Sequence, residues 1–305
     1  MNDLTTEIKK LEIKTLDNLK MSKAKNTIRA YKSDFNDFAL FCSRHGMLSL
    51  PTEPKIVSLY LTHLSKQSKY STLKRRLASI NVMHRYKGHY LDTKHPIIVE
   101  NLLGIKRQIG VHQKSKKPLL FNNLKQIIEV INNSKENKFK KLRDKTLILV
   151  GFSGGFRRSE LVSITRDDIE FVKEGVKIFV RKSKSDQSGE GMTKAIPYFD
   201  NKNFCPVASL KKFIDIYQIK SGYIFDISDK SVALIIKKYA SLSGLDASRY
   251  GGHSLRSGFA TSTAELGAEE RSIMAMTGHK TTQMVRRYIQ EANLFKNNAL
   301  NKLKL

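Results

Sequence analysis

Residues 154–161 read Gly-Gly-Phe-Arg-Arg-Ser-Glu-Leu, and three further short polar motifs follow them along the chain. These motifs are His253-Ser254-Leu255-Arg256, Gly278-His279 and Arg287-Tyr288. The glycines before Arg157 allow a tight backbone turn, and the spacing of His253 and Arg256 would put both side chains on one face of a helix. We therefore expect one site that brings basic side chains and a tyrosine together.

The charge of the chain indicates a polyanionic partner. Its 305 residues carry a formal net charge of +27, and residues 1–107 contain 20 Lys and Arg against 9 Asp and Glu. The excess is therefore spread over the chain rather than confined to a basic tail. Such a charge favours nucleic acid over an anionic membrane surface or an acidic protein.

The sequence lacks the motifs of several other protein classes. No apolar run approaches the roughly 18 residues of a membrane helix, and the first residues have no signal-peptide pattern. There is no phosphate-binding glycine loop, and neither the distant Cys42 and Cys205 nor any carboxylate cluster has metal-ligand spacing. We therefore expect a cytoplasmic, nucleoid-associated protein that needs neither cofactor nor metal and has two buried thiols.

The residue types suit the cleavage of a phosphodiester by a side chain. The planar fork of an arginine binds two phosphate oxygens and stays protonated, so Arg157 and Arg256 can neutralise transition-state charge. A tyrosine, with an ordinary pKa of about 10, needs such cationic surroundings to attack phosphorus. The departing oxygen needs a proton, for which Lys182, Lys184 and Lys194 are rival candidates.

In order and spacing, these motifs resemble those of the tyrosine recombinase, or phage integrase, family in its simple Cre or Xer form. The resemblance assigns six catalytic residues and one supporting carboxylate: Arg157, Lys184, His253, Arg256, His279, Tyr288 and Glu160. It makes Tyr288 the nucleophile, the two arginines the phosphate clamp and Lys184 the proton donor to the leaving oxygen. His253 would bind the phosphate and assist proton transfer, and Glu160 would orient the first arginine.

The first part of the chain predicts a small helical domain. Apolar residues step by three and four from Ile28 to Cys42, and three more amphipathic helices follow. We expect a flexible arm over residues 1–20, a core DNA-binding domain over 21–107 and a basic linker over 108–118. The side chains expected to contact DNA phosphates are Lys69, Lys74, Arg75, Arg76, Arg85, Lys87, Lys106, Arg107, Lys114, Lys116 and Lys117.

The second part predicts a mixed α+β catalytic domain over residues 119–290. A strand at 176–180 is expected to pair with one near 169–171, and a third strand is expected at 195–198. Among the helices expected after it are 253–266, 269–276 and 281–290, with Tyr288 at the end of the last. The fold class is therefore mainly α with a small antiparallel sheet, of the DNA breaking-rejoining type, and the resemblance implies a C-shaped clamp on DNA.

The resemblance implies a site-specific recombinase or integrase of a mobile element that acts through a 3′-phosphotyrosyl intermediate. It implies double-stranded DNA with paired inverted half-sites, and a homotetramer on DNA assembled from free monomers or weak dimers. Residues 291–305 are expected to form a helix exchanged between protomers, and the short arm leaves little room for an arm-binding domain. The alternatives are DNA relaxation by a type IB topoisomerase and DNA binding by a recombinase-derived protein without catalysis.

Overall fold

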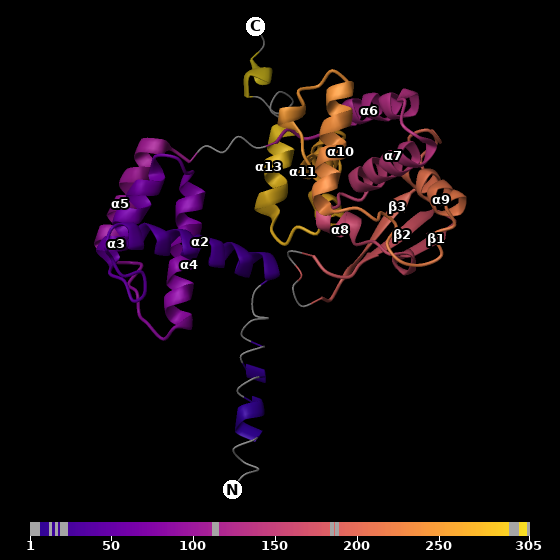
Figure 1. Cartoon of the computed structure of the whole chain (residues 1–305). Helices are drawn as coiled ribbons and strands as arrows, with labels where there is room; N and C mark the ends of the chain where they lie inside the picture. The colour runs from indigo at the N-terminus through magenta and orange to yellow at the C-terminus, as the bar shows by residue number, and fades with distance from the viewer. Residues whose placement is uncertain are drawn as a thin grey trace. The chain divides into compact units, whose positions relative to one another are not determined.

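The computed structural model describes residues 7–11, 14–15, 18, 24–111, 116–183, 186, 189–292 and 299–303. The chain divides into two units, residues 1–114 and 115–305, and each has its own hydrophobic core. Both are mostly helical, and the sheet that the structure describes belongs to the second unit (Figure 1). The expected fold class, mainly α with a small antiparallel sheet, is therefore confirmed.

Four helices surround the core of the first unit: α2 (Lys25–Arg44), α3 (Pro54–Ser65), α4 (Tyr70–Tyr86) and α5 (Pro96–Ile109). Phe38, Tyr60 and Leu73 are buried where α2, α3 and α4 meet. Pro54 and Pro96 are the first residues of their helices, where the missing N–H costs no hydrogen bond. The helical periodicity read from the sequence therefore corresponds to a real core.

A buried carboxylate connects α2 to α4 within the first unit. Asp34 is 3% exposed, and one of its oxygens accepts a hydrogen bond from Arg75. Its other oxygen lies 3.3 Å from Nε of Arg76, and Nη1 of the same arginine lies 3.2 Å from a carboxylate oxygen of Asp37. Two arginines that were expected to face DNA thus bind acidic side chains of their own domain.

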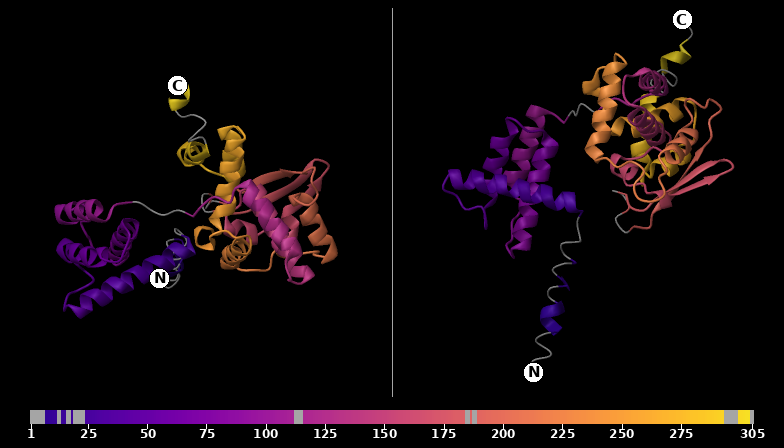
Figure 2. Two further views of the ribbon diagram at one scale, coloured as in Figure 1. Left: turned by 90° about the horizontal axis from the view of Figure 1, so that it is seen from above. Right: turned by 45° about the vertical axis from the view of Figure 1, so that its right-hand side comes forward.

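The second unit contains eight described α-helices and one sheet. The helices are α6 (Phe121–Asn133), α7 (Lys138–Ser153), α8 (Arg158–Val162), α9 (Pro206–Ile216), α10 (Asp229–Leu242), α11 (His253–Glu265), α12 (Glu270–Thr277) and α13 (Thr282–Ala292), and short 3-10 turns lie at Arg166–Asp168, Ala247–Arg249 and Ala299–Lys302. The views in Figure 2 place the sheet at one edge of this unit. No helix in the described ranges is long and apolar enough to cross a membrane.

The sheet has the order β1 (Ile169–Val172), β2 (Gly175–Val180) and β3 (Met192–Pro197), and both pairings are antiparallel. The third strand was expected at 195–198, but it begins at Met192 because its pairing with β2 continues as far as Val180. This correction places Lys194 inside the strand. Lys194 and Ile196 are the buried residues of β3, as alternation along a strand requires.

Helix α11 packs against the last helices of the second unit. Its Ala260 and Ala264 form a small buried cluster with Val285 of α13, and Tyr288 packs against this cluster. Helix α13 contributes Val285, Tyr288 and Ile289 to this contact and extends to Ala292. Tyr288 therefore lies within the helix and not at its end, contrary to the sequence expectation.

The substitution Asp34→Ala is expected to lower the free energy of unfolding by about 2 kcal/mol, because it removes the hydrogen bonds that this buried carboxylate accepts from Arg75 and Ser79. Urea unfolding of the full chain, followed by circular dichroism, measures this loss. Arg75→Ala is the control, because its side chain is 43% exposed and its loss should cost only about 0.5 kcal/mol. Equal losses in the two variants would contradict a structural role for Asp34.

Candidate active site

Arg157 lies where the chain turns from α7 into α8. Gly155 makes this turn with a φ of 54°, a conformation that glycine adopts without strain, and Arg157 is the N-cap of α8. The carboxylate of Glu160 is buried and lies 2.5 Å from Nη1 of Arg157. It also accepts a 3.0 Å hydrogen bond from the backbone N–H of Arg157. Glu160 therefore holds both the side chain and the backbone of this arginine.

Helix α11 supplies the next two basic residues. His253 is its first residue, and Arg256 follows one turn later. Arg256 is 1% exposed, and its Nη1 donates a 2.9 Å hydrogen bond to the carbonyl of Gly155. Its Nη2 is also buried but has no hydrogen-bond partner in the described part of the chain. Nε2 of His253 lies 3.2 Å from the hydroxyl oxygen of Tyr288. Both arginine motifs and the tyrosine thus meet in one site.

His279 enters the same site from the end of α12. Gly278 caps this helix in the left-handed conformation, with a φ of 62°. His279 is buried, its Nδ1 lies 2.8 Å from the hydroxyl of Thr277, and its ring centre lies 6.1 Å from that of Tyr288. Five of the six residues expected to be catalytic are therefore close together. The sixth, Lys184, lies outside the described residues.

Lys194 lies beneath the site. It is 1% exposed, and its Nζ donates hydrogen bonds of 2.7 Å to the carbonyl of Gly154 and 2.5 Å to that of Met276. The first carbonyl belongs to the turn that presents the first arginine, and the second precedes the turn that presents the second histidine. The sequence suggested Lys194 only as a rival proton donor. Its alternation with Ile196 was a signal for burial, but it was missed because the strand was expected to begin at residue 195, just after Lys194.

Crowded positive charge changes the pKa values in the site. Burial, together with Arg256 and Arg157, lowers the pKa of His279 to about 4. Burial and the same two arginines also lower the pKa of His253. Burial is the main reason that the pKa of Lys194 falls to about 7. Burial and the two arginines thus disfavour the protonated form of each of these groups, and a bound anion would oppose the effect of the arginines.

The residues expected to contact DNA phosphates have mostly exposed side chains. These are Lys69, Lys74, Arg75, Arg85, Lys87, Lys106, Arg107, Lys116 and Lys117. Arg76 differs, because its side chain is 19% exposed and lies against Asp34 and Asp37. Lys116 donates a hydrogen bond to the carbonyl of Ser248, and Lys114 lies outside the described residues. The contacts of all these residues with DNA stay predictions.

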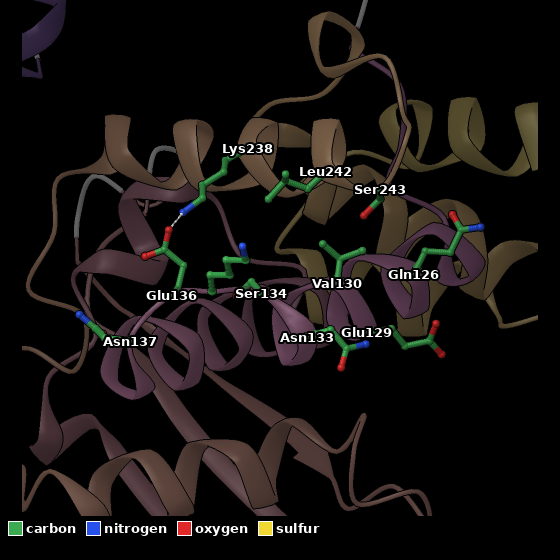
Figure 3. A pocket seen from close by; sticks show the side chains of 11 residues that line it. Gln126, Glu129, Val130, Asn133, Ser134, Glu136, Asn137, Lys238, Leu242 and Ser243 are labelled. Atoms are coloured by element: carbon green, nitrogen blue, oxygen red, sulfur yellow. Dashed lines mark hydrogen bonds and ion pairs between the residues drawn. The ribbon is translucent and has the colours of Figure 1, made fainter.

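A separate hollow of about 940 Å³ lies between α6 and α10 (Figure 3). Its lining combines Val130 and Leu242 with Glu129 and the ion pair of Glu136 with Lys238. None of the five described residues expected to be catalytic lines this hollow. The hollow is therefore separate from the cluster around Arg256.

Two arginines, two histidines and a tyrosine thus meet in a mainly helical unit. Such a set of residues is typical of enzymes that cut and rejoin DNA strands with a tyrosine as the nucleophile. Comparison with known proteins identifies the family: the model of the phage integrase family matches residues 117–294, and that of the phage integrase N-terminal SAM-like domain matches residues 16–89. The chain belongs to the phage integrase family and is a tyrosine-type site-specific DNA recombinase. The alternatives of a topoisomerase and a non-catalytic binding protein are not favoured.

Individual relatives agree with this assignment. The chain is 41% identical over 309 residues to an integrase/recombinase XerD homolog of Selenomonas ruminantium, with 96% of this chain and 90% of the relative covered. It is 26% identical over 275 residues to the tyrosine recombinase XerC of Staphylococcus aureus, with 88% and 87% covered. The XerH recombinase bound to a palindromic difH substrate shares its fold, with a TM-score of 0.68 at 16% identity over 89% of this chain and 80% of XerH. The Tn1549 transposon integrase in complex with transposon right end DNA gives a TM-score of 0.63 at 16% identity, with 90% and 94% covered.

Proposed function

We propose that the chain recombines DNA by linking Tyr288 covalently to a DNA 3′-phosphate, without metal or ATP. The observation that carries this proposal is the buried Nη2 of Arg256, which lacks an acceptor among the described residues. It lies in the site where His253 contacts Tyr288. A buried donor without an acceptor costs about 1–3 kcal/mol. A non-bridging phosphate oxygen is an acceptor that would remove this cost and add a charge-assisted bond.

In this reaction, the hydroxyl oxygen of Tyr288 attacks phosphorus, and the bond from phosphorus to the 5′-oxygen breaks. His253, whose Nε2 lies 3.2 Å from that hydroxyl, accepts the phenol proton, and Lys184 gives a proton to the leaving 5′-oxygen. Arg157 and Arg256 neutralise the non-bridging oxygens. The phosphotyrosine conserves the bond energy, so the 5′-hydroxyl of another strand can reverse the step.

The proposed partner is double-stranded DNA with paired inverted half-sites. Support comes from the net charge of +27, from the exposed basic residues of the first unit and from the similarity to XerH bound to a palindromic substrate. On this DNA, four protomers would assemble, each holding the duplex as a C-shaped clamp, from monomers or weak dimers free in the cytoplasm or on the nucleoid. We also propose that the recombinase belongs to a mobile element and that residues 291–305 are exchanged between protomers.

Tyr288→Phe is expected to abolish covalent attachment, because only the attacking oxygen is removed, and to change DNA affinity by less than about twofold. The substrate is a nicked suicide duplex that carries a site selected by binding from a random pool, and the adduct is detected by denaturing electrophoresis. Tyr223→Phe, an exposed tyrosine of the same unit, is the control and should form the adduct normally. An adduct that persists in Tyr288→Phe would assign the nucleophile to another residue.

Lys184→Ala is expected to slow cleavage by about 10²-fold or more, because the leaving oxygen loses its proton donor. A 5′-bridging phosphorothioate should restore the rate, since a thiolate leaves without protonation. Lys182→Ala and Lys194→Met are the matched controls, and the sulfur substrate should not rescue either of them. Rescue of a control instead of Lys184→Ala would transfer the proton-donor role to that residue.

Truncation after Ala292 is expected to preserve binding to a single half-site and to remove cooperative binding to the paired site. The reason is that the deleted segment includes Leu300 and Leu303, which are 67% and 60% exposed, and Leu294 and Phe295, which lie outside the described residues. Apolar side chains of this kind favour a contact between protomers. A gel-shift titration with one and two half-sites measures the effect, and unchanged cooperativity would show that the segment is not exchanged.

A further inference from the structure

The hydroxyl of Thr277 lies between the carbonyl of Ile273 and the ring of His279. Thr277 is fully buried, and its Oγ1 lies 2.6 Å from the Ile273 oxygen and 2.8 Å from Nδ1 of His279. Two oxygens at 2.6 Å repel each other unless a proton lies between them, so the hydroxyl donates to the carbonyl. Because a hydroxyl carries one proton, its oxygen must accept a hydrogen bond from His279, whose Nδ1 is therefore the protonated nitrogen.

This contact determines what the other nitrogen of His279 can do. With the hydrogen on Nδ1, Nε2 of the neutral ring carries a lone pair and can only accept a hydrogen bond. Nε2 points away from Thr277, because the two ring nitrogens diverge, and it has no partner among the described residues. A phosphate oxygen is also only an acceptor. The neutral ring in this tautomer therefore cannot bind a phosphate through Nε2 unless it first gains a proton there.

The surroundings keep His279 neutral until an anion arrives. Charged and titratable groups face it from each element packed around the site: Arg157 and Glu160 at α8, Lys194 on β3, His253 and Arg256 on α11, and Tyr288 on α13. Burial and the two arginines hold the pKa of His279 at about 4. A phosphate placed against the arginines would oppose their effect and raise this pKa.

We propose that Thr277 is a positioning residue that holds neutral His279 in the Nδ1–H tautomer and thereby couples engagement of the scissile phosphate to the uptake of one proton at Nε2. The proton comes from the solvent, the new N–H donates to a non-bridging oxygen, and no other bond changes. The Thr277 hydroxyl accepts from Nδ1 both before and after this step, so the ring keeps its position. The phosphate step rests on the proposed function, whereas the tautomer is a property of the free protein.

The tautomer is tested without DNA. Long-range ¹H–¹⁵N correlation spectra of the full chain, labelled at histidine and recorded near pH 7.5, should show Nδ1 of His279 protonated in the wild type and in Thr277→Ser. In Thr277→Val, a hydrogen on Nδ1 would be buried without an acceptor, so the spectrum should change to the Nε2–H form. Thermal melting checks that both variants fold, and His279→Gln identifies the signal. An Nε2–H ring in the wild type would overturn the proposal even if the valine variant did not fold.

The proton coupling is tested by cleavage of the suicide duplex between pH 6 and pH 9. Thr277→Ser should follow the wild type and lose rate at high pH as the imidazolium is lost, by about tenfold per pH unit above its pKa in the complex. In Thr277→Val, neutral His279 already carries a hydrogen on Nε2 and needs no further proton. The ratio of the Thr277→Val cleavage rate to the Thr277→Ser rate should therefore rise by at least tenfold between pH 6 and pH 9. A ratio that does not change with pH would overturn the coupling. Absence of cleavage by the wild type would contradict the proposed function, while the spectra would still decide the tautomer.

Discussion

The buried carboxylate of Glu160 faces a group of cations that would otherwise repel one another. It binds Arg157 directly, and its charge also favours the protonated forms of Arg256 and Lys194. Two like charges 4 Å apart repel by about 4 kcal/mol at the effective dielectric of a protein surface. One carboxylate cannot cancel several such pairs. The fold therefore keeps net positive charge in this site, and the placement of the neighbouring turns follows from this constraint.

Backbone carbonyls supply the rest of the compensation. Arg256 donates to the carbonyl of Gly155, and Lys194 donates to those of Gly154 and Met276. A carbonyl oxygen satisfies a buried N–H without adding a full negative charge, so these bonds hold the cations while leaving their charge available to an anion. They also tie the loop before α8 to the end of α12. The same contacts that stabilise the buried cations thus fix the turns that carry Arg157 and His279.

The first unit also pairs a buried carboxylate with arginines, but here the pairing stabilises the helical domain. The run Lys74-Arg75-Arg76 suggested phosphate contact, but two of its members lie against Asp34, a buried carboxylate on another helix. Arg76 is 19% exposed, so it is held largely by its own domain. A basic run on a helix therefore does not by itself identify a DNA-binding face. The acidic partner that binds it can be some forty residues away in the chain and is visible only after folding.

Local patterns in the sequence predicted the helices and the antiparallel sheet, except for the start of β3, and the resemblance to a known family predicted which residues meet in the site. The 3.6-residue period, the alternation along strands and the spacing of His253 and Arg256 are short-range properties, because each follows from the geometry of one element. The places of Lys194 and Thr277 depend on tertiary structure. Lys194 contacts carbonyls 40 and 82 residues away in sequence, and no local rule relates positions so far apart. Thr277 is only two residues from His279, yet the state of that ring depends on charges brought in by α8, β3 and α11, which become neighbours when the chain folds.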